Sequence, residues 1–398
     1  MEAKAITSLV SEYVAQYFGQ PNRWIARLIV QEHPEVWGTG DRAVETARSV
    51  VRGKNKPDHR PLVSFPTAEP ITEELTERIR KSILNTPQSI ESLSDKFNVA
   101  PKLVRKSLEK ITEGKYNLLE TEKGVQISTT IQPGAHANLN PSMWEGEVIR
   151  IGVVSDNHLC NVHSREDVLN LLYDRFEQEN IPLVYNCGNW IDGEHRFNKN
   201  ELTVHGCTAQ VKYFVDHYPK RTGVETHFIA GDDHEGWFVQ REGIDVGAYA
   251  EMMAHDYGRT DLVYLGYAEA DVLLTPDAPD KQWMRVLHAG GGSAYALSYS
   301  SQKIAEAVQG GEKPKIMLIG HYHKFDYAYP REIHMVQVGC TCDQSLFMRK
   351  NKIQAMVGGC IVEMTKNCDG MIQRVRIEWI PFYDKKFYEG RDKYLMTN

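Results

Sequence analysis

Cysteine is scarce in this sequence, and none occurs in the first 159 of its 398 residues. The seven cysteines are odd in number, and no two of them form the CxxC pair typical of zinc ribbons and redox sites. These absences exclude a disulfide-stapled secreted scaffold. The pattern suits a reducing cytoplasm.

Long apolar runs are missing as well. The opening stretch "MEAKAITSLVSEYVAQYF" is charged and amphipathic where a signal peptide needs an unbroken apolar core, and no run approaches the length of a membrane span. The composition, 41% hydrophobic and 25% charged, is that of ordinary globular proteins. We therefore expect a soluble cytoplasmic protein of two or three domains, in a bacterial or phage-infected cell, with no membrane partner and with homo-oligomerisation left open.

Charge is unevenly distributed along the chain. Residues 1–130 carry 19 Lys and Arg against 17 Asp and Glu, whereas the remainder carries 27 against 36. An acidic second part suits a domain that concentrates cations, although a charge balance of this size is also typical of solvated surface.

The first 60 residues show three stretches of helical periodicity, which suit a helix-turn-helix unit. Basic residues gather at the end of the third stretch and beyond it, at Arg48, Arg52, Lys54, Lys56 and Arg60. The proline-rich residues 56–70 predict a linker.

A second module, residues 70–131, combines three helix candidates with two strand-like runs around Lys123-Gly124, which resembles a winged-helix domain. Its third helix candidate, "APKLVRKSLEKIT", carries four basic residues, Lys102, Arg105, Lys106 and Lys110. Small helical modules also serve protein contacts, but we expect these to bind nucleic acid, with DNA favoured. Residues 132–144, rich in Pro, Asn and Gly, predict a second linker.

From residue 145 to 398, strands alternate with helices, which indicates an α/β domain. Five apolar runs there are each followed at once by Asp, Asn or His, in the segments "VIRIGVVSDNH", "IPLVYNCGNWIDGEH", "ETHFIAGDDHE", "WMRVLHAGG" and "KIMLIGHYH". Each segment by itself is more often a solvated turn or a hydrogen-bonded core histidine than a metal site.

Together the five strand ends predict a dinuclear metal site. Loops that leave the carboxyl ends of strands in an α/β sheet converge on one crevice, and glycine lets the backbone turn sharply there. Asp, Asn and His are donors for Mn, Fe, Zn or Ni, and the absence of cysteine from these ends argues against a structural zinc site. In Asp-x-His and His-x-His, alternate residues point the same way and can face one metal pair.

The order of these motifs resembles that of the calcineurin-like metallophosphoesterases, over residues 148–362. The family carries DxH, GDxxD, GNH followed by Asp or Glu, a separate His, and GHxH. The wider arrangement, including "VHG", "YPKRTGVETHFIAGDDHEGW" and "GHYHKFDYAYP", looks most like phage- and prophage-type members that are DNA-repair-exonuclease-like. The resemblance implies two β-sheets packed face to face, flanked by helices, with the metals at one edge of the sandwich.

The resemblance also implies roles for single residues. One of two divalent metal ions, manganese first with Fe, Zn, Ni or Mg as alternatives, would be held by Asp156, His158 and His323. The other would be held by His288 and His321. His234 would protonate the leaving oxygen or stabilise the transition state.

Two positions depart from the family pattern in opposite directions. The family's bridging aspartate falls on Asn189, and its terminal asparagine falls on Asp233. The formal charge supplied by Asp156 and Asp233 stays at −2, which favours a rearranged site. Asp233, a hydroxide, Asp192 or Asp232 could supply the shared charge, and the choice between Asp232 and Asp233 is open.

Five further residues have both a functional and an ordinary interpretation. His195 and Arg196 could contact phosphate or form a surface pair. Trp237, Tyr322 and Tyr327 could stack on a base or pack within the protein.

The first function hypothesis is a metal-dependent phosphodiesterase, a nuclease whose N-terminal modules hold DNA or RNA, with water activated by two metals. The second is a phosphodiesterase or phosphatase of small nucleotides or phosphoproteins. The third is a non-catalytic DNA-binding protein with an altered metal site.

Overall fold

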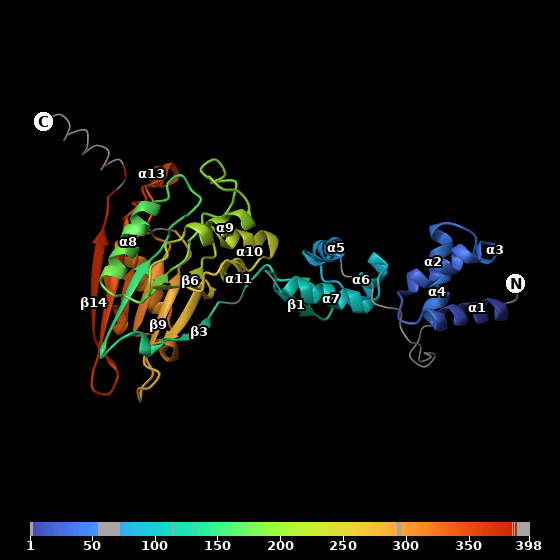
Figure 1. Cartoon of the computed structure of the whole chain (residues 1–398), viewed down its shortest axis with the longest axis horizontal. Helices are drawn as coiled ribbons and strands as arrows, with labels where there is room; N and C mark the ends of the chain where they lie inside the picture. The colour runs from blue at the N-terminus through green and yellow to red at the C-terminus, as the bar shows by residue number, and fades with distance from the viewer. Residues whose placement is uncertain are drawn as a thin grey trace. The chain divides into compact units, whose positions relative to one another are not determined.

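The chain folds as two units, residues 1–128 and residues 129–398 (Figure 1). The computed structural model describes residues 3–54, 72–113, 115–131, 133–292, 296–383, 385 and 387. The expected first linker, residues 56–70, lies outside these described residues, as do Lys56 and Arg60.

The first half of the N-terminal unit is a helical cluster with its own core. The helices are α1 (Ala3–Gln16), α2 (Asn22–Glu32), α3 (Pro34–Trp37) and α4 (Asp41–Lys54). Ile25 and Ile29 of α2 pack against Ala47 and Val51 of α4, and all four are fully buried. The three expected helices are therefore present, with the single turn of α3 added between the second and the third.

The second half has three helices followed by a hairpin, in the predicted order. The elements are α5 (Glu73–Ile83), α6 (Ile90–Phe97), α7 (Pro101–Thr112), β1 (Leu118–Thr121) and β2 (Gly124–Ile127). The side chains of Thr72 and Ser89 cap α5 and α6 by accepting backbone hydrogen bonds. Gly124 has φ 124°, and a Cβ at this position would lie only 2.2 Å from the carbonyl oxygen of Gln88. Glycine is therefore needed at this turn.

Two mixed six-stranded sheets form the second unit. In order across the first sheet, the strands are β14 (Ile372–Pro381), β13 (Gly358–Lys366), β4 (Val148–Val154), β5 (Leu183–Asn186), β6 (Glu225–Ala230) and β7 (Leu262–Tyr267). Across the second, they are β11 (Asp326–Ala328), β12 (His334–Gln337), β10 (Ile316–Gly320), β9 (Trp283–His288), β8 (Glu269–Leu273) and β3 (Ala135–Asn138).

The sheets pack face to face around one core. Ile151 and Val153 of β4 share a buried cluster with Val286 of β9 and Leu318 of β10. Strands β4, β5 and β6 run parallel in one sheet, as do β9 and β10 in the other. The expected α/β sandwich of two sheets is therefore present, and all five apolar runs singled out in the sequence are strands.

Helices flank both sheets. They are α8 (Glu166–Gln178), α9 (Cys207–His217), α10 (Gly236–Glu242), α11 (Val246–Asp256), α12 (Leu297–Ala307) and α13 (Leu346–Lys350), with 3₁₀ turns at Pro141–Met143, Gly310–Glu312 and Pro330–Glu332. Gly152 lets α8 approach β4, because a Cβ there would lie 2.9 Å from the Phe176 ring. Among the described residues, every helix is too short or too polar to cross a membrane.

The prediction that residues 132–144 form a linker is wrong for residues 135–138. These residues form β3, which pairs in parallel with β8 at the edge of the second sheet. Leu139 is buried in the sandwich core, and Trp144 donates a hydrogen bond to the Arg150 carbonyl oxygen at 2.9 Å. An edge strand pairs on one side only and tolerates residues that are rare in central strands. The Pro, Asn and Gly content of this segment therefore concealed the strand.

Candidate metal centre

Three side chains from two strand ends form the first cluster. Asp156 and His158 follow β4, and His323 follows β10. The His323 Nε2 atom lies 3.4 Å from Asp156 Oδ1 and 3.1 Å from His158 Nε2. Asp156 is completely buried, and the two imidazoles are nearly so.

A second cluster joins the ends of β6, β9 and β10. One Asp233 oxygen lies 3.1 Å from His288 Nε2, and the other lies 3.2 Å from His321 Nδ1. The backbone amide of His321 donates to Asp156 Oδ2 at 2.9 Å, so Asp156 contacts residues of both clusters. Each cluster combines carboxylate oxygen with imidazole nitrogen, donors that divalent metal ions accept. In the second cluster, the ligand atoms of Asp233, His288 and His321 all lie close enough together to hold one ion.

Backbone and carboxylate acceptors fix which imidazole nitrogens face the clusters. His288 Nδ1 lies 2.7 Å from the Cys187 carbonyl oxygen, and His321 Nε2 lies 2.6 Å from the Gly291 carbonyl oxygen. A carbonyl can only accept, so these nitrogens carry the protons when the rings are neutral. The lone pairs of the opposite nitrogens are then directed to the cluster, as metal ligation requires.

Asn189 lies between the two clusters. Its Nδ2 atom is 3.4 Å from Asp156 Oδ1, while its buried Oδ1 atom has no hydrogen-bond partner. A Cβ on Gly231 would lie 2.7 Å from that oxygen and 2.8 Å from His288 Cδ2, so glycine is needed for this approach. An unsatisfied buried oxygen beside two donor clusters fits a position that coordinates a cation.

The backbone at these positions is strained. Six of the predicted site residues have φ values in the left-handed region, which few residues other than glycine adopt, namely Asp156 (51°), His158 (47°), Asn189 (53°), His234 (46°), His321 (87°) and His323 (56°). Each such residue costs on the order of 1–3 kcal/mol and persists only where surrounding contacts impose it. The concentration of strain at one edge marks a functional site.

Asp192 positions two of the histidines. Its Oδ1 atom lies 2.9 Å from His158 Nδ1 and 3.1 Å from His234 Nδ1. Its other oxygen accepts hydrogen bonds from Asn161 and Asn198 at 2.7 and 2.8 Å. Asp192 therefore lies behind the ligands and orients them, and the structure does not bring it between the clusters.

Glu235 is a buried clamp under the site. Its Oε1 atom accepts hydrogen bonds from the backbone amides of Asn189 and Gly231, both at 2.8 Å. Burial disfavours its charged form and raises the pKa of Glu235 to about 7. Through these two hydrogen bonds, Glu235 fixes the distance between the loop after β5, which carries Asn189, and the loop after β6, which carries Gly231.

The electrostatic field of the site separates the pKa values of its groups. Burial opposes the charge of Asp156, but the positive charge of His323 and the bond between them hold its pKa well below the usual range. Burial also opposes the charges of His234 and His288, yet hydrogen bonds to Asp192 and Asp233 raise their pKa values to about 9 and about 10. In contrast, burial and the neighbouring His234 lower the pKa of His158 to about 4.

The remaining candidates take different places. Asp233 contacts the histidines, whereas Asp232 is exposed, and its carbonyl oxygen accepts a hydrogen bond from the Gln240 side chain. Tyr322 is buried and donates to the Gly290 carbonyl oxygen, and Tyr327 bonds to His334 at 2.8 Å. The Tyr322 ring is therefore packed within the protein, whereas the Tyr327 ring is 45% exposed.

Trp237 lies beside His234, and His195 lies next to Trp237. Trp237 stacks on His234 with ring centroids 4.6 Å apart, and His195 lies 5.0 Å from Trp237. The Arg196 guanidinium lies over the ring of Phe197, which the motif comparison did not single out. The structure therefore brings these residues together on one side of the site.

Cys342 is a further residue that the sequence pattern did not indicate. Its Sγ atom lies 3.5 Å from His323 Nδ1, on the side of the ring away from Asp156. Cys342 follows β12, whose end carries none of the Asp, Asn or His that marked the five strand ends. Its only signal in the sequence was the pair of nearby cysteines, Cys340 and Cys342.

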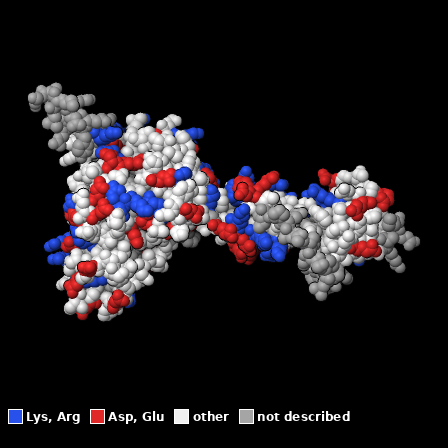
Figure 2. Space-filling view, viewed as in Figure 1, with Lys and Arg blue, Asp and Glu red and all other residues white. Residues whose placement is uncertain are grey.

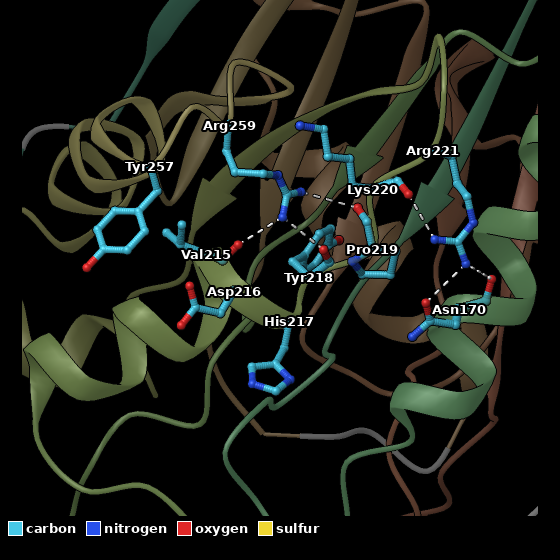
Figure 3. A pocket seen from close by; sticks show the side chains of 10 residues that line it. All are labelled: Asn170, Val215, Asp216, His217, Tyr218, Pro219, Lys220, Arg221, Tyr257 and Arg259. Carbon is cyan, nitrogen blue, oxygen red and sulfur yellow. Dashed lines mark hydrogen bonds between the residues drawn. The ribbon is translucent and has the colours of Figure 1, made fainter.

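A surface cavity of about 390 Å³ lies elsewhere, before the first residues of β6 and β7 (Figure 3). Figure 3 shows Arg259 bonded to backbone carbonyl oxygens at the end of α9, and Arg221 bonded to Asn170. These cations already have protein partners. The cavity therefore has no role in the metal centre.

No family model and no curated protein matches this chain. Among solved structures, it is similar to an archaeal phosphodiesterase (12% identity, 58% of this chain and 100% of that chain, TM-score 0.31). It is also similar to Vps29 in complex with zinc from Entamoeba histolytica (13%, 59% and 100%, TM-score 0.29). A third similar structure is a predicted phosphoesterase from Streptococcus pneumoniae TIGR4 (12%, 60% and 100%, TM-score 0.28). The TM-scores are below 0.5, and these similarities carry no weight in assigning the activity.

Proposed function

We propose that this protein is a metal-dependent phosphodiesterase that hydrolyses nucleic acid, with DNA as its substrate. The observation that carries the proposal is the pair of adjoining clusters, Asp156 with His158 and His323, and Asp233 with His288 and His321. Two divalent ions bound there would supply a nucleophilic hydroxide at neutral pH and neutralise charge on the phosphoryl oxygens.

Asp233 compensates for the amide at Asn189. Its two oxygens contact one histidine each, so the second cluster has its own carboxylate. Asp156 serves the first cluster in the same way. Each cluster thus has one carboxylate, in agreement with a rearranged site that retains its charge.

His234 is the proton donor in this proposal. With its Nδ1 atom held by Asp192, Nε2 is the nitrogen left to face a substrate. In the metal-free protein, the bond to Asp192 and the nearby carboxylates raise the pKa of His234 to about 9, which favours the protonated ring that donates to the leaving oxygen. Asp192 keeps the ring in the orientation that this transfer needs.

A basic helix face in the N-terminal unit supports nucleic acid as the substrate. Lys102, Arg105, Lys106 and Lys110 are exposed on α7, while the apolar side chains of that helix are buried. Figure 2 shows both basic and acidic side chains on the surface of the N-terminal unit. Arg48 is less available, because it forms ion pairs with Glu45 and Asp95. Exposed Lys and Arg gathered along one helix supply the positive charge that binding to backbone phosphates requires.

The proposal is tested with purified protein and Mn²⁺ on a simple diester, a monoester, single-stranded DNA and duplex DNA. We expect cleavage of the diester and of DNA, abolished in His323→Ala and retained in the exposed-surface control Leu171→Ala. Turnover of the monoester alone would favour a phosphatase of small nucleotides or phosphoproteins. Absence of metal binding by calorimetry would favour a non-catalytic DNA-binding protein.

A further inference from the structure

A row of aromatic rings leads outward from the metal centre. His234 contacts His158, with ring centroids 4.3 Å apart, and Trp237 stacks on His234 at 4.6 Å. His195 follows at 5.0 Å from Trp237, and Phe197 at 4.5 Å from His195. The rings therefore form a continuous path from a metal ligand to the surface.

Packing does not account for the outer end of this row. Phe197 is 72% exposed, the highest value among the large apolar side chains described, whereas core aromatics such as Trp190 are fully buried. Leaving most of an aromatic ring in water forgoes about 25 cal/mol for each Å² of apolar surface that could be buried. A ligand that covers Phe197 would recover this free energy.

The row is held rigidly against the site. Asn198 is buried, and its side chain accepts from the His195 backbone amide at 2.8 Å while donating to the Asp192 carboxylate at 2.8 Å. Asp192 in turn holds His158 and His234. The rings and the proposed catalytic groups therefore share one hydrogen-bonded frame.

Glycine at position 193 allows the loop that carries His195 and Phe197 to contact the loop that carries His234. Gly193 has φ 62°, and a Cβ there would lie 2.0 Å from the His234 carbonyl oxygen. The loop that carries the outer rings can thus lie directly on the loop that carries His234. Such a fixed distance between rings and reaction centre is what recognition of a substrate segment requires.

We propose that Phe197, His195 and Trp237 form a platform that stacks an unpaired base of the nucleotide next to the phosphodiester bond that is cut. This inference rests on the proposed function and narrows its substrate to single-stranded or frayed nucleic acid, because a base within a duplex does not expose its face to a protein ring. Arg196, exposed with its guanidinium 4.9 Å from the Phe197 centroid, adds positive charge beside the platform for the anionic backbone.

Binding tests the platform without any need for catalysis. A thymidine octamer with a central 2-aminopurine is titrated with the full chain in the absence of metal, and the fluorescence quenching caused by stacking is followed. For Phe197→Ala we expect loss of the quenching and binding about five- to 150-fold weaker, the range for removal of one base–aromatic stack. Phe197→Trp should keep both, and Tyr257→Ala, which removes a ring of 56% exposure at the end of α11, should behave as wild type.

Equal quenching and affinity in wild type and Phe197→Ala would overturn the platform. A second measurement compares cleavage, with Mn²⁺, of the thymidine octamer and of an octamer with abasic residues beside the central bond. We expect wild type to favour the octamer with bases and Phe197→Ala to lose most of that preference. Absence of all diester cleavage would refute the proposed function, while the quenching experiment would still decide whether the platform binds a base.

Discussion

Asn189→Asp is the most informative perturbation of the metal centre. It places a carboxylate where the amide now lies, with one atom 3.4 Å from Asp156 Oδ1 and fully buried. In the metal-free protein, the change replaces a weak attraction with the repulsion of two carboxylates. With divalent ions held by the two clusters, the added carboxylate would be attracted to their positive charge, and the change would become favourable.

The size of the effect follows from the geometry. Two unit charges 3.4 Å apart repel by about 5 kcal/mol at an effective dielectric constant of about 20. Protonation of one carboxyl group at pH 7 limits this cost to about 4 kcal/mol. Nearby His323 and His288 offset part of it, so we expect the free energy of unfolding to fall by about 2–4 kcal/mol, or the melting temperature by about 5–15 °C.

Thermal unfolding of metal-free and Mn²⁺-saturated protein measures this prediction. The variant should be destabilised only without metal, and the difference should shrink as the pH falls toward about 4, where the added carboxyl group is protonated. The double variant Asn189→Asp/Asp233→Asn restores the original charge and should regain the metal-free stability that the single variant loses. A metal-free single variant as stable as wild type would refute the placement of position 189 beside Asp156.

Other predictions concern the supports of the site. Glu235→Ala should lower the free energy of unfolding in urea by about 2–6 kcal/mol, because two buried amides lose their acceptor, while Glu235→Gln should keep most of the stability. Gly231→Ala should weaken Mn²⁺ binding in calorimetry, because the added Cβ would displace the neighbouring Asn189 and His288 side chains. Gly292→Ala, whose Cβ would enter open space, should bind Mn²⁺ as wild type does. Equal Mn²⁺ affinity in Gly231→Ala and wild type would contradict the close packing at Gly231. The stability that His234 and His288 gain from their carboxylates should be complete in metal-free protein below pH 6.5 and be lost as the pH rises through about 9 and 10. Urea midpoints that stay constant or rise from pH 6.5 to 10 would contradict this assignment.

Sequence patterns predicted much of the fold because they report local structure. An apolar run followed by Gly and Asp or His marks a strand and its polar end, and β4, β5, β6, β9 and β10 all lie where such runs occur. Helical periodicity likewise placed the N-terminal helices. The resemblance of the motif order to a known family implied a sandwich of two sheets, but not the strand β3, whose composition is that of a linker.

The choice of ligands could not be settled from spacing. Asp232 and Asp233 are adjacent in sequence, and only the turn after β6 directs Asp233 rather than Asp232 toward His288. The contact between Cys342 and His323 was equally hidden, because the two come together only after the ends of β10 and β12 are brought side by side. Side-chain direction in a strained loop depends on contacts made with distant parts of the chain.

The sequence by itself determined which chemistry this protein can carry: carboxylates, amides and imidazoles at the ends of five buried strands. Tertiary structure alone decided how those groups are used. It placed three strand ends in one sheet and two in the other, put Asp192 behind the ligands, and left Asn189 with an unsatisfied oxygen between two clusters. The reason is that residue type and periodicity are properties of neighbours in the chain, whereas a donor set is fixed by long-range strand pairing and by the packing of two sheets on each other.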